Sequence, residues 1–375
     1  KDTNLSQKTS YTESLFIHLE KITNYLLSNI DPNTHCLKIN YGDWNDALDG
    51  LGEINGDRSH WGNGVSVMAS LQLYECLEQL IDLYNYLDKD TSFLKEKRTL
   101  LEKGLLKNSI VTLKNEKKIV HGWGHNQSYY VGSFQDSDNI SRDSLTSNAF
   151  FVISNMINKK PSLKNDILLA LKRLDSKYGF KTFSVGFQAD VKGVGRIVNL
   201  PIGTAENGAV YVHASLFATL ALYKLGKGKE AFFQLKKLLP IYHKKITTSP
   251  FIMSNSYSYN QELGLDGDSM NDWYTGSSNT LIKTIVRGLW GVKNTLKLLI
   301  IKPSNYFFSN KAELKLLINQ TIVTLSYSNT KNNKRIFLIN NNQCNEVFFN
   351  KISKELYIEI DKSKLTDTLN IQIID

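Results

Sequence analysis

The 375-residue sequence has few cysteines and no long apolar run. Cys36, Cys76 and Cys344 are odd in number and far apart, and none belongs to a CxxC pair or to a Cys/His cluster with the spacing of metal ligands. We therefore expect reduced thiols and no metal site. No stretch approaches the roughly 20 apolar residues that a membrane-spanning helix requires, so we expect no membrane partner.

Arginine-rich tracts and nucleic-acid-binding motifs are also missing, although the net charge is +9. The lysines are spread along the chain, which indicates a solvated basic surface and no nucleic-acid partner. A secretory signal is not visible, and the chain opens with Lys1 in place of Met. We interpret the start as truncated and expect a cytoplasmic protein.

Helical periodicity dominates the first 292 residues. Ser10 and Glu13 have the spacing of a capping box, and Leu15, Leu19 and Ile22 follow at helical intervals. Long polar loops join the predicted helices, which favours an antiparallel helical barrel or solenoid with a site among the loops at one end. The further predicted helices span about 65–86, 93–106, 147–157, 164–174, 210–225, 230–239 and 279–290.

The pattern changes after residue 292 to short runs with alternating or β-branched residues, broken by Asn, Ser, Lys and Pro. This change predicts a small antiparallel β-sandwich at 293–375, after a helical domain at 1–292. The predicted strands span 296–301, 313–318, 322–327, 335–339, 355–360 and 369–374.

A loop at 41–50, with the sequence YGDWNDALDG, is the most informative segment for function. It combines three carboxylates with Trp44 and Asn45. An aromatic ring stacks on the apolar face of a pyranose, while carboxylates and amides hydrogen-bond hydroxyls or protonate a glycosidic oxygen. The alternative is an acidic loop in which Asp43 or Asp49 caps a turn, as Asp often does.

Two further segments are rich in polar groups. In GTAENGAVYVH at 203–213, a glycine-containing loop leads into a helix, which allows Glu206 and His213 to face one cleft; the alternative for His213 is a structural histidine. In WYTGSSN at 273–279, hydroxyls and glycine precede a predicted helix. Such a helix N-terminus can bind an anion, or it can be a plain N-cap.

Taken together, these motifs resemble the inverting phosphorylases of glycoside hydrolase family 94. GDWND at 42–46, ENG at 206–208 with His213 after it, and WYTG at 273–276 occur in the order seen in that family, and PFIMSN at 250–255 and GLWGV at 288–292 resemble two further landmarks. The resemblance covers nearly the whole chain. It implies a mainly α fold, the C-terminal portion of an (α/α)6 barrel followed by a small C-terminal β-sandwich domain.

The resemblance also implies residue roles. Asp46 would be the general acid, and because an acid must carry a proton, we expect burial or the neighbouring Asp43 to keep it protonated. The residues implied to contact sugar are Trp44, Asp43, Glu206 and Asn255, and those implied to bind phosphate are His213, Thr275 and Gly276.

The implied reaction is cleavage of a β-linked glucoside by inorganic phosphate to give α-glucose 1-phosphate, with no cofactor besides this co-substrate. An inverting hydrolase needs a second carboxylate to activate water, whereas phosphate is already an anionic nucleophile. The alternatives are an inverting hydrolase on the same barrel and a non-catalytic glycan-binding remnant. A homodimer of the full-length protein is a further option.

Two departures from the family limit which of its properties can be expected of this chain. Before Tyr11 there is no counterpart of the family's N-terminal β-sandwich, nor of the early barrel segment that brings an arginine to phosphate. We therefore expect this chain alone to be inactive. We also expect the inner faces of its helices near 15–26 and 67–83 to be exposed. Ala205 stands where cellobiose phosphorylases typically place a lysine, which argues against cellobiose. Cellobionic acid and β-1,2- or β-1,3-glucans stay open as substrates.

Overall fold

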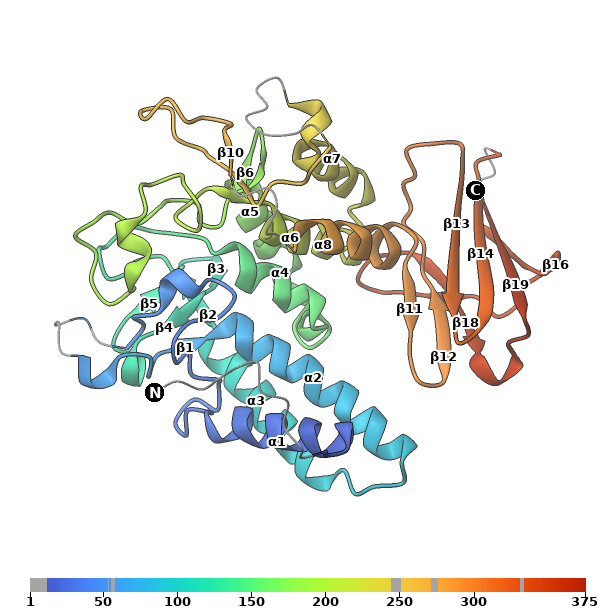
Figure 1. The fold of residues 1–375 in the computed structure, drawn as a ribbon, viewed down its shortest axis with the longest axis horizontal. Coiled ribbons are helices and arrows are strands. Elements are labelled where there is room, and N and C mark those ends of the chain that lie inside the picture. The colour runs from blue at the N-terminus through green and yellow to red at the C-terminus, as the bar shows by residue number, and fades with distance from the viewer. Residues whose placement is uncertain (1–11, 53, 55–57, 244–250, 271–275, 331–333) are drawn as a thin grey trace.

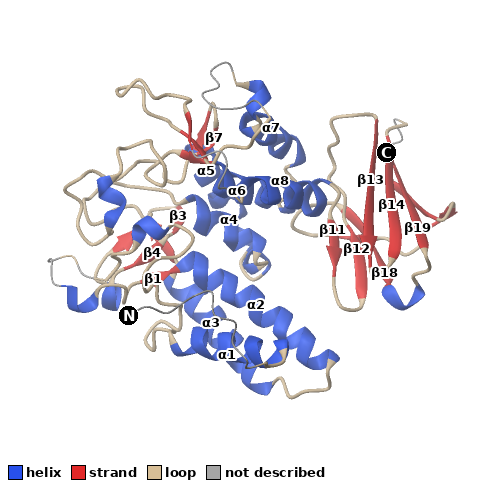
Figure 2. Cartoon of the chain, in the orientation of Figure 1, coloured by secondary structure: helices blue, strands red, loops and turns tan. Residues whose placement is uncertain are grey.

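The computed structural model describes residues 12–52, 54, 58–243, 251–270, 276–330 and 334–375. Helices are the main regular structure of the chain up to Leu289, and the two largest sheets are built from the residues after it. Figure 1 shows these two parts side by side, and Figure 2 shows the same division by secondary structure. Within the described residues, no helix has the length and apolarity needed to cross a membrane.

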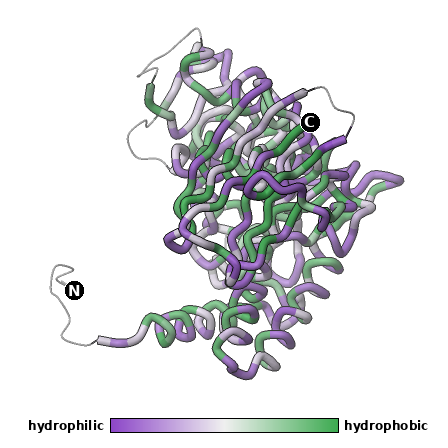
Figure 3. Tube along the Cα trace, turned by 90° about the vertical axis from the view of Figure 1, so that its right-hand side faces the viewer, coloured by the Kyte–Doolittle hydropathy of each residue, from purple (hydrophilic) through white to green (hydrophobic). Residues whose placement is uncertain are grey.

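Helix α1 (Leu15–Ser28) begins after Ser14, whose Oγ accepts a hydrogen bond from the Ile17 N–H at 3.3 Å. The predicted cap at Ser10 lies outside the described residues. Leu15, Ile22 and Tyr25 are more than half exposed on this helix, whereas Leu26 packs against the main core, so the apolar side lacks a partner only in part. Figure 3 shows the N-terminal helix at the edge of the molecule, with hydrophobic positions along it.

The other helices form a row, and a second layer of helices packs against that row. In the row, each helix packs on the next. The row consists of α2 (Val67–Tyr86), α4 (Leu145–Ile153), α6 (Val212–Lys224) and α8 (Ser277–Thr284), the last continued by a π-helical turn (Ile285–Leu289). The partners are α3 (Ser92–Asn108) on α2, α5 (Lys164–Leu174) on α4 and α7 (Gly228–Leu238) on α6.

This paired arrangement explains the burial of α2. Its residues Val67, Leu71 and Leu77 are almost fully buried, because the helix packs against both α3 and α4. The expectation that the inner face of this helix lacks partners is therefore wrong. The described residues show a row of helix pairs and not a closed ring of six, so the complete (α/α)6 barrel stays a prediction.

The connections differ in length at the two ends of the row. The row helices α2, α4 and α6 pass to their partners through short connections, at 87–91, 154–163 and 225–227. Long loops at 29–66, 109–144, 175–211 and 239–276 instead lead into the N-termini of α2, α4, α6 and α8. The long loops therefore meet at the N-terminal end of the row. Three of them share a second apolar cluster, in which Leu48, Tyr129 and Ile197 are buried together.

Short strands also tie these loops together, a feature that the helical periodicity did not predict. One three-stranded sheet joins β1 (Val65–Ser66), β4 (Gly122–Trp123) and β5 (Tyr130–Val131), and another joins β8 (Val210–Tyr211), β9 (Ser256–Tyr257) and β10 (Ser269–Met270). The two hairpins are β2 (Ile110–Leu113) with β3 (Glu116–Ile119), and β6 (Asp175–Ser176) with β7 (Gly179–Phe180).

The C-terminal strands form two sheets. All six predicted strands are present, but β14 pairs with β19 in parallel, so the sheets are not purely antiparallel as predicted. Alternate residues of β14, among them Val323 and Leu325, face the core. One sheet contains β11 (Val292–Asn294), β12 (Leu298–Ile301), β18 (Leu356–Asp361) and β17 (Phe348–Phe349); the other contains β13 (Lys311–Ile318), β14 (Thr321–Ser328), β19 (Thr368–Ile374), β15 (Ile336–Ile339) and β16 (Asn342–Gln343).

Candidate active site

The acidic loop lies at the N-terminal end of the helix row and folds into a short 3-10 helix (Asp46–Leu48). Ala47 and Leu48 are buried beneath it, which turns the Asp46 side chain outward. The Asp46 side chain is 66% exposed. Burial by the described residues therefore does not protect the carboxyl group that the resemblance identifies as the acid.

Asp43 points the other way, into the protein. Its Oδ1 accepts the Asn45 N–H at 2.7 Å, and its Oδ2 accepts the hydroxyl of Ser66 and lies 3.4 Å from His121 Nε2. Ser66 also caps α2 by accepting the Ala69 N–H. Burial acts to raise the pKa of Asp43, but the charge of His121 and the hydrogen bonds from His121, Ser66 and Asn45 together lower it.

These contacts correct the predicted role of Asp43. Its side chain is 1% exposed and both oxygens are engaged by the protein, so it does not reach a sugar. Asp43 instead fastens the acidic loop to the start of α2. The alternative that Asp43 is a structural residue agrees with the structure.

Trp44 connects the acidic loop to the start of α6. Its Nε1–H donates to Nδ1 of His213 at 3.2 Å, and its ring packs edge-on against Tyr211 and Phe217 at centroid distances of 4.8 and 6.0 Å. Because Nδ1 accepts a hydrogen bond, the ring is neutral and its hydrogen lies on Nε2. Burial and the charge of Lys283 lower the pKa of His213, which also favours the neutral ring.

His213 and Gly276 lie side by side, although they are far apart in the sequence. A Cβ atom on Gly276 would lie 3.1 Å from Cε1 of His213, so the imidazole ring rests against this residue. Gly276 immediately precedes α8. Thr275, the third residue predicted to bind phosphate, lies outside the described residues. The structure thus brings the imidazole to the N-terminus of a helix, a position whose backbone N–H groups and dipole favour anions.

Glu206 and Asn255 lie next to this group. Burial and the charge of Asp46 raise the pKa of Glu206, and the charge of Arg196 opposes them. The Asn255 side chain hydrogen-bonds the hydroxyl of Tyr211, and its backbone carbonyl accepts the Val212 N–H at the start of α6. Among the described residues, no donor reaches the buried Asn255 Oδ1.

Arg196 is a site residue that the sequence analysis missed. It starts a 3-10 helix (Arg196–Asn199) in the loop before α6, and its Nη2 lies 2.8 Å from Oδ2 of Asp46 and 3.2 Å from the Asp46 carbonyl. The only local signal is the pair of glycines in GVGR at 193–196. Nothing in that pattern indicates which carboxylate the arginine meets.

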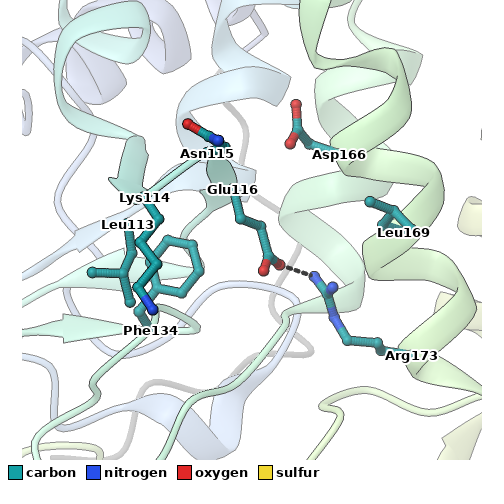
Figure 4. Close-up of a pocket in the computed structure, with 8 residues that line it drawn as sticks. All are labelled: Leu113, Lys114, Asn115, Glu116, Phe134, Asp166, Leu169 and Arg173. Atoms are coloured by element: carbon teal, nitrogen blue, oxygen red, sulfur yellow. Dashed lines mark ion pairs between the residues drawn. The ribbon is translucent and has the colours of Figure 1, made fainter.

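A surface hollow of the described residues lies away from this site. It measures about 470 Å³ and lies between the β2–β3 hairpin and α5 (Figure 4). Arg173 in its wall pairs with Glu116 at 2.8 Å and with Asp143 at 2.6 Å, so its charge is already compensated. The hollow shares no residue with the site around Asp46. Among the described residues, no group of three or more His, Cys, Asp or Glu side chains could hold a metal ion.

Comparison with known proteins adds several relatives that are phosphorylases. The chain is 25% identical over 278 residues to a solabiose phosphorylase of Paenibacillus borealis, covering 70% of this chain and 33% of that protein. It is 24% identical over 320 residues to a 3-O-beta-D-glucopyranosyl-beta-D-glucuronide phosphorylase of the same species, covering 80% and 39%. It is 30% identical over 137 residues to a cellobionic acid phosphorylase of Neurospora crassa, covering 35% and 17%.

The chain thus spans between about a sixth and two fifths of the length of these three relatives. The model of the glycosyl hydrolase 94 superfamily catalytic domain matches residues 3–291, the segment that carries the helix row and the site. This match covers well over half of the chain and ends where the C-terminal sheets begin. The chain therefore belongs to the glycosyl hydrolase 94 superfamily and is phosphorylase-like.

Proposed function

We propose that this chain supplies the catalytic acid and part of the phosphate site of an inverting glycoside phosphorylase. The reaction cleaves a β-linked glucoside, a di- or oligosaccharide, with inorganic phosphate and releases α-glucose 1-phosphate. One observation carries the proposal: Trp44 joins the loop of Asp46 to a neutral His213 that lies against Gly276 at the N-terminus of α8. The named relatives, all phosphorylases, support it.

The chemistry follows from the groups present. Asp46 donates its proton to the glycosidic oxygen as the bond to C1 breaks, and a phosphate oxygen attacks C1 from the opposite face, which inverts the configuration. The Nε2–H of His213 donates to phosphate, and the α8 N-terminus adds an electrostatic attraction for the anion. Phosphate needs no base to activate it, so this reaction requires no second catalytic carboxylate and no other cofactor.

An assay of the complete gene product, with and without inorganic phosphate, tests the proposal. We expect β-glucoside consumption only with phosphate, and stoichiometric α-glucose 1-phosphate. Release of free glucose from the donor end without phosphate would make the enzyme a hydrolase. Glucoside binding without either product would make the protein a glycan-binding remnant.

A further inference from the structure

Strand β13 lies at the end of its sheet, beside β14 (Figure 1). The sheet order runs from β13 through β14, β19 and β15 to β16, so within the described residues one side of β13 has no neighbouring strand. β13 has eight residues, whereas the strands at the other edges of the two C-terminal sheets, β11, β16 and β17, have three, two and two. Short edge strands resist pairing with another chain, and a long one favours it.

The backbone groups on the free side of β13 belong to alternate residues. The Asn310 carbonyl accepts the Asn329 N–H at 2.9 Å, and the same register continues along the whole of β13. Hydrogen-bonded pairs alternate along an antiparallel ladder, so the even-numbered residues of β13 bond to β14 and the odd-numbered residues turn their N–H and C=O groups outward. The outward residues are Lys311, Glu313, Lys315 and Leu317.

The side chains of the outward residues are exposed and carry charges of both signs. Glu313 and Lys315 are 58% and 66% exposed, with 3.5 Å between the carboxylate and the ammonium group, and Leu317 is 74% exposed. Lysines on an edge strand commonly prevent pairing with another chain. An edge that alternates lysine with glutamate excludes only those partners that bring like charges together.

We infer that β13 pairs antiparallel with β13 of a second copy of this chain, about a two-fold axis at Leu314. In this register Glu313 of each copy lies opposite Lys315 of the other, so the four charges form a square in which every charge has neighbours of opposite sign. Leu317 lies opposite Lys311, whose alkyl stem covers the exposed leucine. Main-chain hydrogen bonds between the two edges join the sheets of the two copies.

The charges select this register from its neighbours. An axis at Glu313 would place Glu313 against itself and Lys311 against Lys315, and an axis at Lys315 would place Lys315 against itself. An axis at Ala312 would keep opposite charges together but would leave Leu317 uncovered and would pair less of the strand. Because the complementary arrangement lies at the centre of β13, a second copy fits this edge along its whole length.

Sedimentation of the complete gene product at several concentrations tests the pairing. We expect a dimer that dissociates on dilution. Lys315→Glu changes both Glu–Lys pairs into like-charge pairs and should raise the dimer Kd about fourfold or more. The double variant Glu313→Lys with Lys315→Glu restores both pairs and should recover the wild-type Kd. Lys297→Glu is the matched control, because Lys297 is an exposed lysine between β11 and β12 in the other sheet.

Single cysteine substitutions test the register. Leu314→Cys places two thiols opposite each other at the axis, in a non-hydrogen-bonded pair with about 4.5 Å between Cα atoms, which is within reach of a disulfide. Leu316→Cys is the control, because position 316 lies opposite Ala312 of the other copy in this register. After mild oxidation we expect a disulfide-linked dimer from Leu314→Cys, above the background that the wild-type cysteines give, and none from Leu316→Cys.

Three results would overturn the inference: a wild-type protein that is monomeric at every concentration, a dimer whose Kd Lys315→Glu leaves unchanged, or cross-linking through Leu316→Cys alone. None of these measurements depends on catalysis. A protein without phosphorylase activity would therefore refute the proposed function and leave the test of β13 intact.

Discussion

Replacing Trp44 with Phe tests the link between the acid loop and the phosphate site. The structure gives Trp44 a task besides the sugar contact that the resemblance implies, since its indole N–H donates to His213 and fixes the tautomer that presents Nε2–H. Phenylalanine keeps an aromatic ring against Tyr211 and Phe217 but removes the donor. The substitution therefore isolates one hydrogen bond.

The size of the effect follows from the energy of that bond. A neutral hydrogen bond contributes about 0.5–1.5 kcal/mol net, which corresponds to about a 2- to 13-fold change in an equilibrium constant. Without the donor, His213 populates both tautomers and turns more freely, so its Nε2–H is offered to phosphate for less of the time. We expect the phosphate KM to rise by about this factor, and the KM of the glucoside to change less than about twofold.

Initial rates of phosphorolysis at varied phosphate and saturating glucoside give the numbers. Trp290→Phe serves as the control, because Trp290 is a buried tryptophan that packs on Phe307 at the opposite end of α8 and its turn. It should lower stability and leave the phosphate KM alone. A rise in the glucoside KM with an unchanged phosphate KM in Trp44→Phe would refute the reasoning and return Trp44 to the sugar site.

Three other substitutions test the same geometry. Asp46→Asn should lower kcat by about 100- to 10,000-fold with little change in sugar binding by calorimetry; near-normal turnover would transfer the acid role to Glu206, since Asp43 is buried. Asp43→Asn should cost about 2–3 kcal/mol in urea unfolding at pH 7. Because the pKa of Asp43 is lowered, its contribution is fully present above the ordinary value of 3.8 and is lost as pH falls below that value and through the lowered pKa, so the two unfolding curves should draw together in acid, and a constant gap would contradict this. Gly276→Ala places a Cβ atom 3.1 Å from the His213 ring and should raise the phosphate KM several-fold, without altering the melting temperature by more than a few degrees; an unchanged KM would separate the two residues functionally.

The helices and strands could be predicted because their signals are local. Apolar spacing located α2 to α8, and alternation located the six longer strands of the C-terminal sheets, with errors mainly at the ends. The start of α1 shows why ends are harder: Ser10 and Ser14 are both acceptable caps, and the choice depends on where the chain packs. The parallel pairing of β14 with β19 joins segments far apart in sequence, so no local pattern indicates it.

The site could be predicted only as a set of residue types. Motif order identified the loops of Asp46, Glu206 and His213, but not which way each side chain points. Asp43 and Asp46 are three residues apart in one loop, yet one is 1% and the other 66% exposed. The difference arises because His121 and Ser66, which come from other segments, capture Asp43 inside the protein. The orientation of a side chain depends on the residues that it contacts, and those residues lie outside the motif.

Arg196 is a partner of this kind, because it comes from a loop 150 residues further along the chain than Asp46. The motifs alone supply an acid, a neutral donor and a helix N-terminus, and none of them indicates a guanidinium beside the acid. The guanidinium lies 2.8 Å from the Asp46 carboxylate, so the side of the site that holds the acid also carries a positive charge. A substitution at Arg196 therefore tests a contact that the motifs alone could not predict.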